Sequence, residues 1–248
     1  MAIILTFFFI HWFCSLFFHT FFLHRYASHR MYLTSPTWEK IFYFLTWMFQ
    51  GSSYLVPRAY AVMHRMHHAY SDTEKDPHSP HFFKDVWAMM KHTRNIYNSF
   101  VINSNVPDKQ FTKEYLPVWS KMDKIGDHMI TRLLWIALYI LIYVYFSPSW
   151  YWFLLLPVHF LMGPVQGAVV NWCGHKYGYS NFNNGDHSRN SEPWGILLLG
   201  ELFQNNHHFY PNRAKFAVKR FEWDPTFFIM RIMNKLRIIK IQYDPIKV

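Results

Sequence analysis

Histidine is the most informative residue type in this 248-residue chain. The sequence has 16 His, more than its 15 Asp and Glu together, and seven of these His fall in three short clusters. Three clusters read HRYASHR, HRMHH and QNNHH, and one further histidine ends the segment NWCGH. The eight residues are His24, His29, His64, His67, His68, His175, His207 and His208. Neutral imidazole binds Fe, Zn, Cu and Ni, so these clusters predict a transition-metal site.

The spacing and number of these side chains indicate two metal ions. On an α-helix His64, His67 and His68 stand at i, i+3 and i+4, so their rings share one face. His24 and His29 are about 140° apart on an ideal helix, so they reach two different metals unless the helix unwinds there. Eight imidazoles exceed what one four-coordinate zinc ion can use. The Glu and Glu-x-x-His ligands of soluble di-iron bundles are missing, which favours an all-nitrogen site.

Other residues near the clusters have different expected roles. His11, His19 and His159 lie within apolar segments, where we expect them to pack or to face lipid. If they were ligands instead, the chain would be a bis-histidine membrane haem protein, which is the alternative from another class. A metal transporter would need polar residues along its spanning segments, and these are nearly absent. Candidates to support the ligand rings from behind are Asp76, His78, His81, Asp186 and His187.

Long uncharged segments indicate an all-α integral membrane protein with one domain over 1–248. Residues 2–23 carry no charged side chain and reach roughly 33 Å as a helix, enough to cross the hydrocarbon core. They have no basic n-region and no small-residue cleavage site, so we expect a retained helix rather than a removed signal peptide. Two further spans are expected at about 130–146 and 150–173, joined by a tight turn at Ser147-Pro148-Ser149.

The apolar segment at about 38–60 is constrained by the chemistry. The histidine clusters before and after it must lie on one side of the membrane if they build one site. A single crossing would separate them, and the segment is too short for two crossings of about 20 residues each. We therefore expect an interfacial or re-entrant helix, broken near Gln50–Ser53 and at Pro57. An ordinary spanning helix is the alternative, and it would destroy the shared site.

The distribution of charge predicts the orientation. All 25 Lys and Arg fall in 25–132 or 176–248, which the expected topology places on one face of the membrane. The positive-inside rule makes that face, and with it the active site, cytoplasmic. The net charge of +10 is scattered beside apolar runs, so it indicates anionic lipid rather than nucleic acid. The two cysteines lie far apart and suggest no disulfide framework.

The clusters and their surroundings resemble a known family. The stretches HRYASHR, HRMHHAYSDTEKDPHSP, NWCGHKYGY and QNNHHFYP are similar, in order, spacing and flanking residues, to membrane acyl-CoA and acyl-lipid desaturases of the stearoyl-CoA (delta-9) type. The resemblance covers almost the whole chain, including DHSRN at 186–190 and FEWDPTF at 221–227. It implies a mushroom-shaped helical fold in which a cytosolic cap holds a di-iron centre.

The resemblance also implies roles for individual residues. The eight clustered histidines would bind two iron ions, and Asn171 would help to hold one of them through water. Gln204 stands where the family usually has the first histidine of the third box, so it coordinates weakly, bonds a water ligand or leaves one iron more open. The family usually has another spanning helix before the first box. Only 23 residues precede it here, which leads us to expect the N-terminus outside.

The implied reaction is oxygen-dependent desaturation, which puts a cis double bond into a long acyl chain. Removing two hydrogens from unactivated methylenes is beyond side-chain acids and bases, so a metal cofactor must carry the chemistry, and the resemblance implies two iron ions with O₂ as co-substrate. Zinc is an expected adventitious substitute, because imidazole sites accept it readily. Gln204 keeps a runner-up open: a related di-iron hydroxylase, ketolase or acyl decarboxylase.

Substrate and electrons must come from outside the chain. The substrate is a fatty acyl-CoA or acyl-lipid, and basic residues that could hold its headgroup are Arg58, Lys176 and Arg189. The sequence shows no Gly-rich dinucleotide fingerprint and no four-cysteine cluster. We therefore expect a separate electron donor, which would be a ferredoxin, a rubredoxin or a b-type cytochrome.

Overall fold

The computed structural model describes residues 2–242 and is mostly helical, which confirms the expected fold class. Most of the helices are α-helices, with a π-helix at His19–Ser28 and 3-10 turns at Gly51–Ser53 and Trp150–Leu155. The α-helices are α1 (Ala2–Phe18), α2 (Pro36–Gln50), α3 (Pro57–Tyr70), α4 (Val86–Val101), α5 (Lys109–Thr112), α6 (Ser120–Asp127), α7 (Met129–Phe146), α8 (Leu156–Phe160), α9 (Met162–Gly174), α10 (Gln204–Phe209) and α11 (Pro225–Lys235). The two short strands of an antiparallel pair are β1 (Tyr32–Thr34), near the start of the chain, and β2 (Ile239–Ile241), near the end of the described residues.

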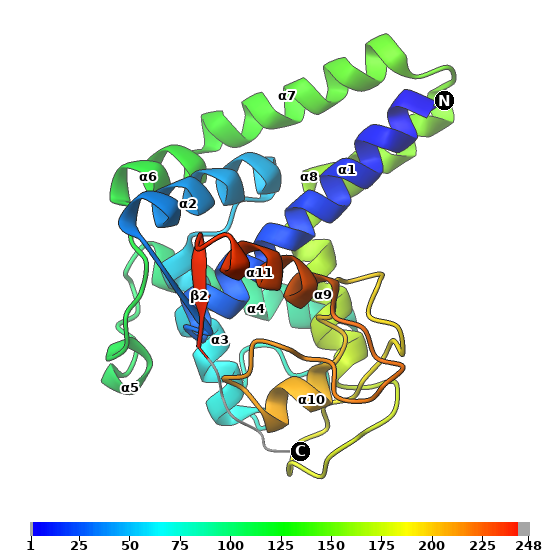
Figure 1. The fold of residues 1–248 in the computed structure, drawn as a ribbon. Helices are drawn as coiled ribbons and strands as arrows, with labels where there is room; N and C mark the ends of the chain where they lie inside the picture. The colour runs from blue at the N-terminus through cyan, green and yellow to red at the C-terminus, as the bar shows by residue number, and fades with distance from the viewer. Residues whose placement is uncertain (1, 243–248) are drawn as a thin grey trace.

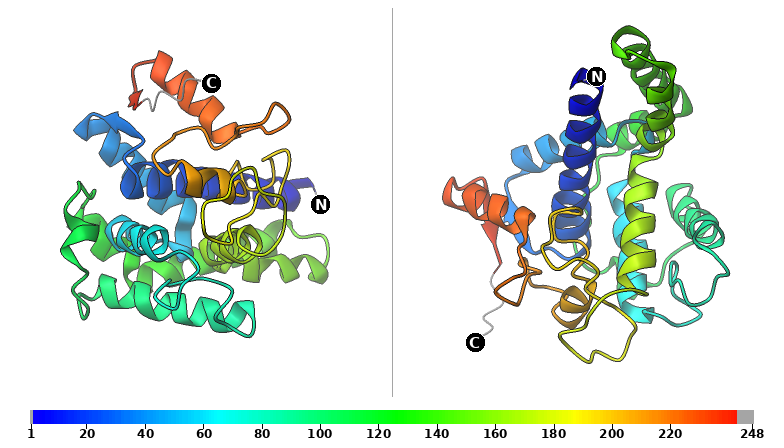
Figure 2. Two further views of the ribbon diagram at one scale, coloured as in Figure 1. Left: turned by 90° about the horizontal axis from the view of Figure 1, so that it is seen from below. Right: turned by 90° about the vertical axis from the view of Figure 1, so that its right-hand side faces the viewer.

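The long helices and the irregular segments gather at opposite ends of the molecule. The start of α1 and the far end of α7 project from one end, whereas α10 and the long loops around it lie at the other (Figures 1 and 2). Within residues 2–242, two helices are long and apolar enough to cross a membrane, Ala2–Ser28 and Met129–Phe146. Trp150–Phe160 and Met162–Gly174 pass the same test only as a bent pair, which would make a third span.

The third expected span is not straight, and proline chemistry explains why. Its two helices meet at 71°. Pro164 has no N–H, so the carbonyl of Phe160, four residues earlier, loses its helical partner. Ser52 supplies one instead, since its Oγ donates to the Phe160 carbonyl at 3.0 Å. Gly163 donates its N–H to Ser53 Oγ at 3.0 Å, so the bend is bonded to protein rather than left open to lipid.

The segment around residues 38–60 breaks where the sequence indicated. Helix α2 ends at Gln50, and Gly51 follows with φ 53°, a left-handed conformation that favours glycine. A Cβ at Gly51 would also collide with the hydroxyl of Tyr139 on α7. Pro57 then occupies the first turn of α3, where its missing N–H costs nothing. The break sends α3 back toward the π-helix, and the two elements pack together.

A buried arginine attaches the C-terminal part of the chain to the first helix. Arg25 is fully buried, and its Nη2 donates to Asp224 Oδ2 at 2.8 Å. Its guanidinium also lies 3.9 Å from the ring centroid of Phe216. Removing one partner of a buried ion pair is strongly destabilising, because it leaves the other charge buried without compensation. This pairing holds the segment before α11 beside the first histidine cluster.

Candidate metal centre

The π-helix decides how the first two histidines point. His24 and His29 lie in or directly after the π-helix His19–Ser28, in which hydrogen bonds run from i to i+5. Residues five apart are then about one turn apart, so both rings lie on one side. Their ring centroids are 5.1 Å apart. The sequence left two arrangements open. The structure has the second of them: the helix changes its winding, and both rings belong to one group.

Five histidines converge through their Nε2 atoms. His24, His29, His64, His68 and His207 each offer a ring nitrogen, and these nitrogens all lie within 4.8 Å of one another. The contacts form a chain: His24 to His207 at 2.8 Å, His207 to His68 at 2.9 Å, His68 to His64 at 3.1 Å, and His64 to His29 at 2.9 Å. We call these residues the five-histidine group. The group draws on the π-helix, α3 and α10.

These distances suit a metal ion better than hydrogen bonds between rings. Zinc–imidazole bonds are about 2.0–2.1 Å long, so two nitrogens bound at right angles to one ion lie about 2.9 Å apart. The four contacts between neighbouring nitrogens, 2.8–3.1 Å, match that spacing. Five such nitrogens would leave one of six positions free around the ion. The donor set therefore fits a six-coordinate transition metal with an open position.

A second group of three histidines lies beside the first. His67, His175 and His208 also bring their ring nitrogens within 4.8 Å of one another, and we call them the three-histidine group. His67 Nε2 lies 3.1 Å from His208 Nε2, and His175 Nε2 is buried without a hydrogen-bond partner among the described residues. A buried nitrogen left unbonded is costly unless something binds it. His67 and His208 each directly adjoin a member of the five-histidine group in sequence, so the two groups are neighbours.

Four carboxylates orient rings of the two histidine groups. Each lies within hydrogen-bond distance of the Nδ1 of one ring: Glu201 with His24 at 2.5 Å, Asp76 with His67 at 2.9 Å, Asp72 with His175 at 2.9 Å, and Asp186 with His208 at 2.6 Å. A carboxylate behind a ring fixes the tautomer and raises the basicity of the other nitrogen. Asp76 and Asp186 were candidates from the sequence. Glu201 and Asp72 were missed, although each lies within four residues of a cluster.

The electrostatics favour neutral imidazoles. Burial lowers the pKa of His64, His68 and His207 well below the usual value, and neighbouring imidazoles lower it further. Burial alone would raise the pKa of Glu201, but His24 and Arg25 beside it bring that pKa down to about 2. Metals bind the neutral form of imidazole, so the rings are ready to coordinate near neutral pH.

Gln204 lies next to the three-histidine group. It is buried at the start of α10, and its Nε2 donates to the Glu201 carbonyl at 2.6 Å. Its side chain packs so closely on Gly174 that a Cβ there would lie 2.5 Å from Gln204 Cγ. Gly174 directly precedes His175, so Gln204 and His175 are in adjacent positions. Asn171 lies one turn earlier on α9, on the same side of the helix as His175.

The other candidates are more dispersed. His78 is buried beside His67 at 4.3 Å between ring centroids, and within residues 2–242 neither of its ring nitrogens has a hydrogen-bond partner. His187 is exposed, although its backbone N–H donates to Asp72 Oδ2 at 2.8 Å and its ring lies 4.4 Å from that of His81, at a tilt of 47°. The three headgroup candidates bond separately: Arg58 to Asn103 at 3.3 Å, Arg189 to Ser180 at 2.8 Å, and Lys176 over the ring of Trp172 at 3.8 Å.

The histidines of the apolar segments bond to each other and to tyrosines. His11 Nδ1 lies 2.6 Å from His159 Nδ1, and their rings stack at 4.9 Å. His159 Nε2 meets the hydroxyl of Tyr143 at 2.9 Å, and His19 Nε2 meets that of Tyr60 at 3.1 Å. A haem would have to stand between two ring nitrogens that face it from opposite sides. The direct contact between His11 and His159 leaves no room for one, which argues against the haem alternative.

Sequence comparison identifies the family. A family model described as "Fatty acid desaturase" matches residues 1–222. The chain belongs to the fatty acid desaturase family. This confirms the resemblance drawn from the histidine boxes, and it makes the protein an oxidoreductase of lipid metabolism. The match includes all eight clustered histidines and the four carboxylates behind them.

Individual relatives of this desaturase come from plants, cyanobacteria and fungi. The Delta-9 desaturase-like 5 protein of Arabidopsis thaliana is 28% identical, over 88% of this chain and 69% of its own length. The sn-1 stearoyl-lipid 9-desaturase of Anabaena variabilis is 29% identical, over 86% of this chain and 74% of its own. A probable acyl-CoA desaturase of Schizosaccharomyces pombe is 31% identical, over 82% of this chain and 41% of its own.

Proposed function

We propose that this desaturase introduces a cis double bond into a long acyl chain, with O₂ as co-substrate and two iron ions held by the two histidine groups. The observation that carries the proposal is the convergence of eight imidazoles into adjacent groups of five and three. Five of the relatives have names that refer to position 9, which makes the ninth carbon the first position to examine. The distribution of Lys and Arg supports an active site on the cytoplasmic face.

The two histidine groups would leave different numbers of coordination positions open on their metal ions. The five-histidine group could nearly saturate a six-coordinate ion, whereas the three-histidine group would leave several positions open. Gln204 and Asn171 lie beside His175, where each could hold a water on that second ion. Iron bound there would supply the oxidising chemistry that unactivated methylenes require. The more open ion is then the better candidate to meet O₂ and substrate.

The residues of the chain contribute positioning. Asp72, Asp76 and Asp186 fix the three rings of the second group, each through its Nδ1. Held this way, the Nε2 atoms cannot turn away from the metal position. A displacement of about 1 Å can cost on the order of a hundredfold in rate, so this support matters for choosing one C–C bond among many.

The substrate carrier and the electron donor are also part of the proposal. The Anabaena variabilis relative is named for a stearoyl-lipid and the Schizosaccharomyces pombe relative for acyl-CoA, so the carrier is left to experiment. Lys176 directly follows His175 in sequence. The backbone N–H of Arg189 donates to the carbonyl of Gly174, which directly precedes His175. Both residues are therefore near the three-histidine group, where they could meet a headgroup phosphate. Electrons would come from a separate donor: a ferredoxin, a rubredoxin or a b-type cytochrome.

The test is product analysis in a host that expresses the protein. Fatty acids are compared by mass spectrometry for the intact protein, for His67→Ala and for His92→Ala. His92 is an exposed histidine outside both groups, so it controls for the loss of a histidine as such. We expect new monounsaturated chains with the intact protein and His92→Ala, and none with His67→Ala.

Other outcomes are also informative. Hydroxylated chains would move the assignment to the related hydroxylases, and shortened alkenes would move it to the acyl decarboxylases. New double bonds that persist in His67→Ala would contradict the metal assignment. Mapping the double bond by fragmentation then gives its position, and lipid fractionation gives the carrier.

A further inference from the structure

Helix α11 exposes two different stripes to its surroundings. Pro225, Thr226 and Met230 face the protein and are buried. Phe228, Ile232 and Leu236, each four residues apart, are 55%, 47% and 64% exposed. Residues spaced by four lie above one another on a helix, so these three form one apolar stripe, and Ile229 beside them is 38% exposed. The surface of a soluble protein rarely exposes so many large apolar side chains next to one another.

The second stripe is basic. Arg231 and Lys235 are exposed, are also four residues apart, and run parallel to the apolar stripe. Two further basic residues, Arg237 and Lys240, follow the helix and are exposed as well. Residues 225–242 contain these four cations and no Asp or Glu. This part of the surface is therefore complementary to an anionic partner.

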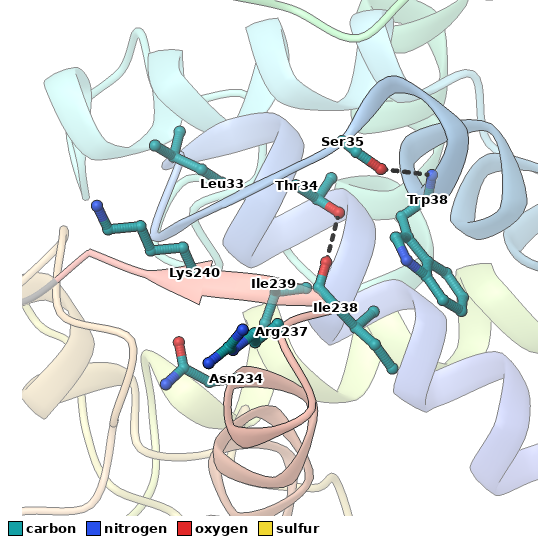
Figure 3. Close-up of a pocket in the computed structure, with 9 residues that line it drawn as sticks. All are labelled: Leu33, Thr34, Ser35, Trp38, Asn234, Arg237, Ile238, Ile239 and Lys240. Carbon is teal, nitrogen blue, oxygen red and sulfur yellow. Dashed lines mark hydrogen bonds between the residues drawn. The ribbon is translucent and has the colours of Figure 1, made fainter.

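A hollow of about 420 Å³ opens beside the end of the helix. Its lining includes Asn234, Arg237 and Lys240, together with Leu33, which pairs with Lys240 across the two strands, and Trp38 at the start of α2 (Figure 3). Arg237 takes a left-handed conformation, with φ 59°, as the chain turns from α11 into β2. The hollow thus combines cationic groups with an indole and an aliphatic side chain, a mixture suited to the boundary between headgroups and acyl chains.

The position of α11 relative to the first expected span indicates what kind of partner its exposed face contacts. Asp224, directly before α11, is paired with Arg25, and the first expected span ends at Leu23. Met230 on the buried side belongs to the same apolar cluster as Phe18 and Phe21 of that first segment. The helix therefore begins at the level where the chain is expected to leave the bilayer.

We propose that α11 lies in the plane of the membrane interface, with its apolar stripe in the acyl region and its cations on anionic phospholipid headgroups. Amphipathic helices with Phe and Leu on one face and Lys or Arg beside them bind membranes in this way, about 5–10 Å into the headgroup–acyl boundary. The hollow would hold the phosphate of one such lipid against Arg237 and Lys240. The inference concerns anchoring and lipid choice, and it needs only the membrane nature of the chain rather than the reaction.

Depth measurement on the full chain tests the proposal. Cys14 and Cys173 are replaced by Ala, a single cysteine is introduced as Ile232→Cys, and it is labelled with an environment-sensitive fluorophore in nanodiscs. Val106→Cys serves as the control, because Val106 is 88% exposed on the loop after α4. Leu236→Cys is a second probe of the same stripe if Ile232→Cys does not fold. Products are analysed for each variant, so a loss of reaction is seen separately from a loss of anchoring.

The expected result is blue-shifted emission at 232 and 236, with stronger quenching by lipids carrying a nitroxide near the headgroup than deep in the chain. Val106→Cys should emit as in water and remain unquenched. Native mass spectrometry should find bound anionic lipid on the intact protein and less on the double variant Arg237→Gln/Lys240→Gln. Water-like, unquenched emission at both 232 and 236 would overturn the proposal. It would indicate that a protein partner, rather than lipid, covers this face. Equal retention of anionic and zwitterionic lipid would overturn the headgroup assignment.

Discussion

Glu201 and His24 lie 177 residues apart in sequence and share a buried hydrogen bond of 2.5 Å between Oε2 and Nδ1. The same carboxylate also contacts Thr20 and Arg25. It therefore connects the segment before the third histidine cluster to the π-helix that carries the first. This contact sets which nitrogen of His24 points into the five-histidine group.

The first prediction concerns this carboxylate. Glu201→Gln keeps the size of the side chain but removes its charge and weakens its hold on His24 Nδ1. We expect metal affinity to fall about 10–100-fold, the usual effect of losing a partner behind a ligand. Competition with a chelator measures this on purified protein. Glu192→Gln is the matched control, because Glu192 is also buried but bonds backbone N–H groups away from both histidine groups.

The second prediction concerns the residue that departs from the family pattern. Gln204→His should fold, because the two side chains are of similar size and Gly174 leaves the space beside them. The new imidazole should join the three-histidine group and slow the loss of its metal to a chelator. Gln204→Leu has similar bulk without a ligand atom and should show no such gain. A misfolded, metal-free Gln204→His protein would show that position 204 does not face the metal.

The third prediction concerns the polar contact inside the apolar segments. Tyr143→Phe removes the hydroxyl that meets His159 and leaves a buried ring nitrogen without that partner. Hydrogen bonds between membrane helices contribute about 0.6 kcal/mol on average and up to about 1.7 kcal/mol. We expect a small fall in the Tm of the detergent-solubilised protein with both metals retained. Tyr145→Phe, at a position 79% exposed, should leave the Tm unchanged. An equal fall in both variants would rule out a specific contribution of the His159 contact.

Much of the site was predictable because it depends on local spacing. His64, His67 and His68 follow the helical repeat, so their common face could be read from the sequence. The break at Gly51 and Pro57 was also predictable, since glycine and proline act through their own backbone geometry. Asp76 and Asp186 lie within HRMHHAYSDTEKDPHSP and DHSRN, two of the stretches that resemble the family, whereas the nearer Asp72 and Glu201 were missed.

The rest depends on contacts between distant segments. Nothing local distinguishes a π-helix at His19–Ser28 from an α-helix, so whether His24 and His29 serve one metal could not be decided. Glu201 acquires its role only when α10 packs on the π-helix. The bend at Leu161 was missed although Pro164 is visible in the sequence, because the rescue of the Phe160 carbonyl by Ser52 comes from another helix.

The most direct test of the metal centre is the number of iron ions per chain, measured by elemental analysis after anaerobic loading with ferrous iron. The intact protein should hold two, and a chelator should remove one well before the other, because three imidazoles hold an ion less tightly than five. His175→Ala should hold one iron, with only the slow release remaining, whereas His92→Ala should match the intact protein. A single iron in the intact protein, or two in His175→Ala with unchanged release, would contradict the two-group centre.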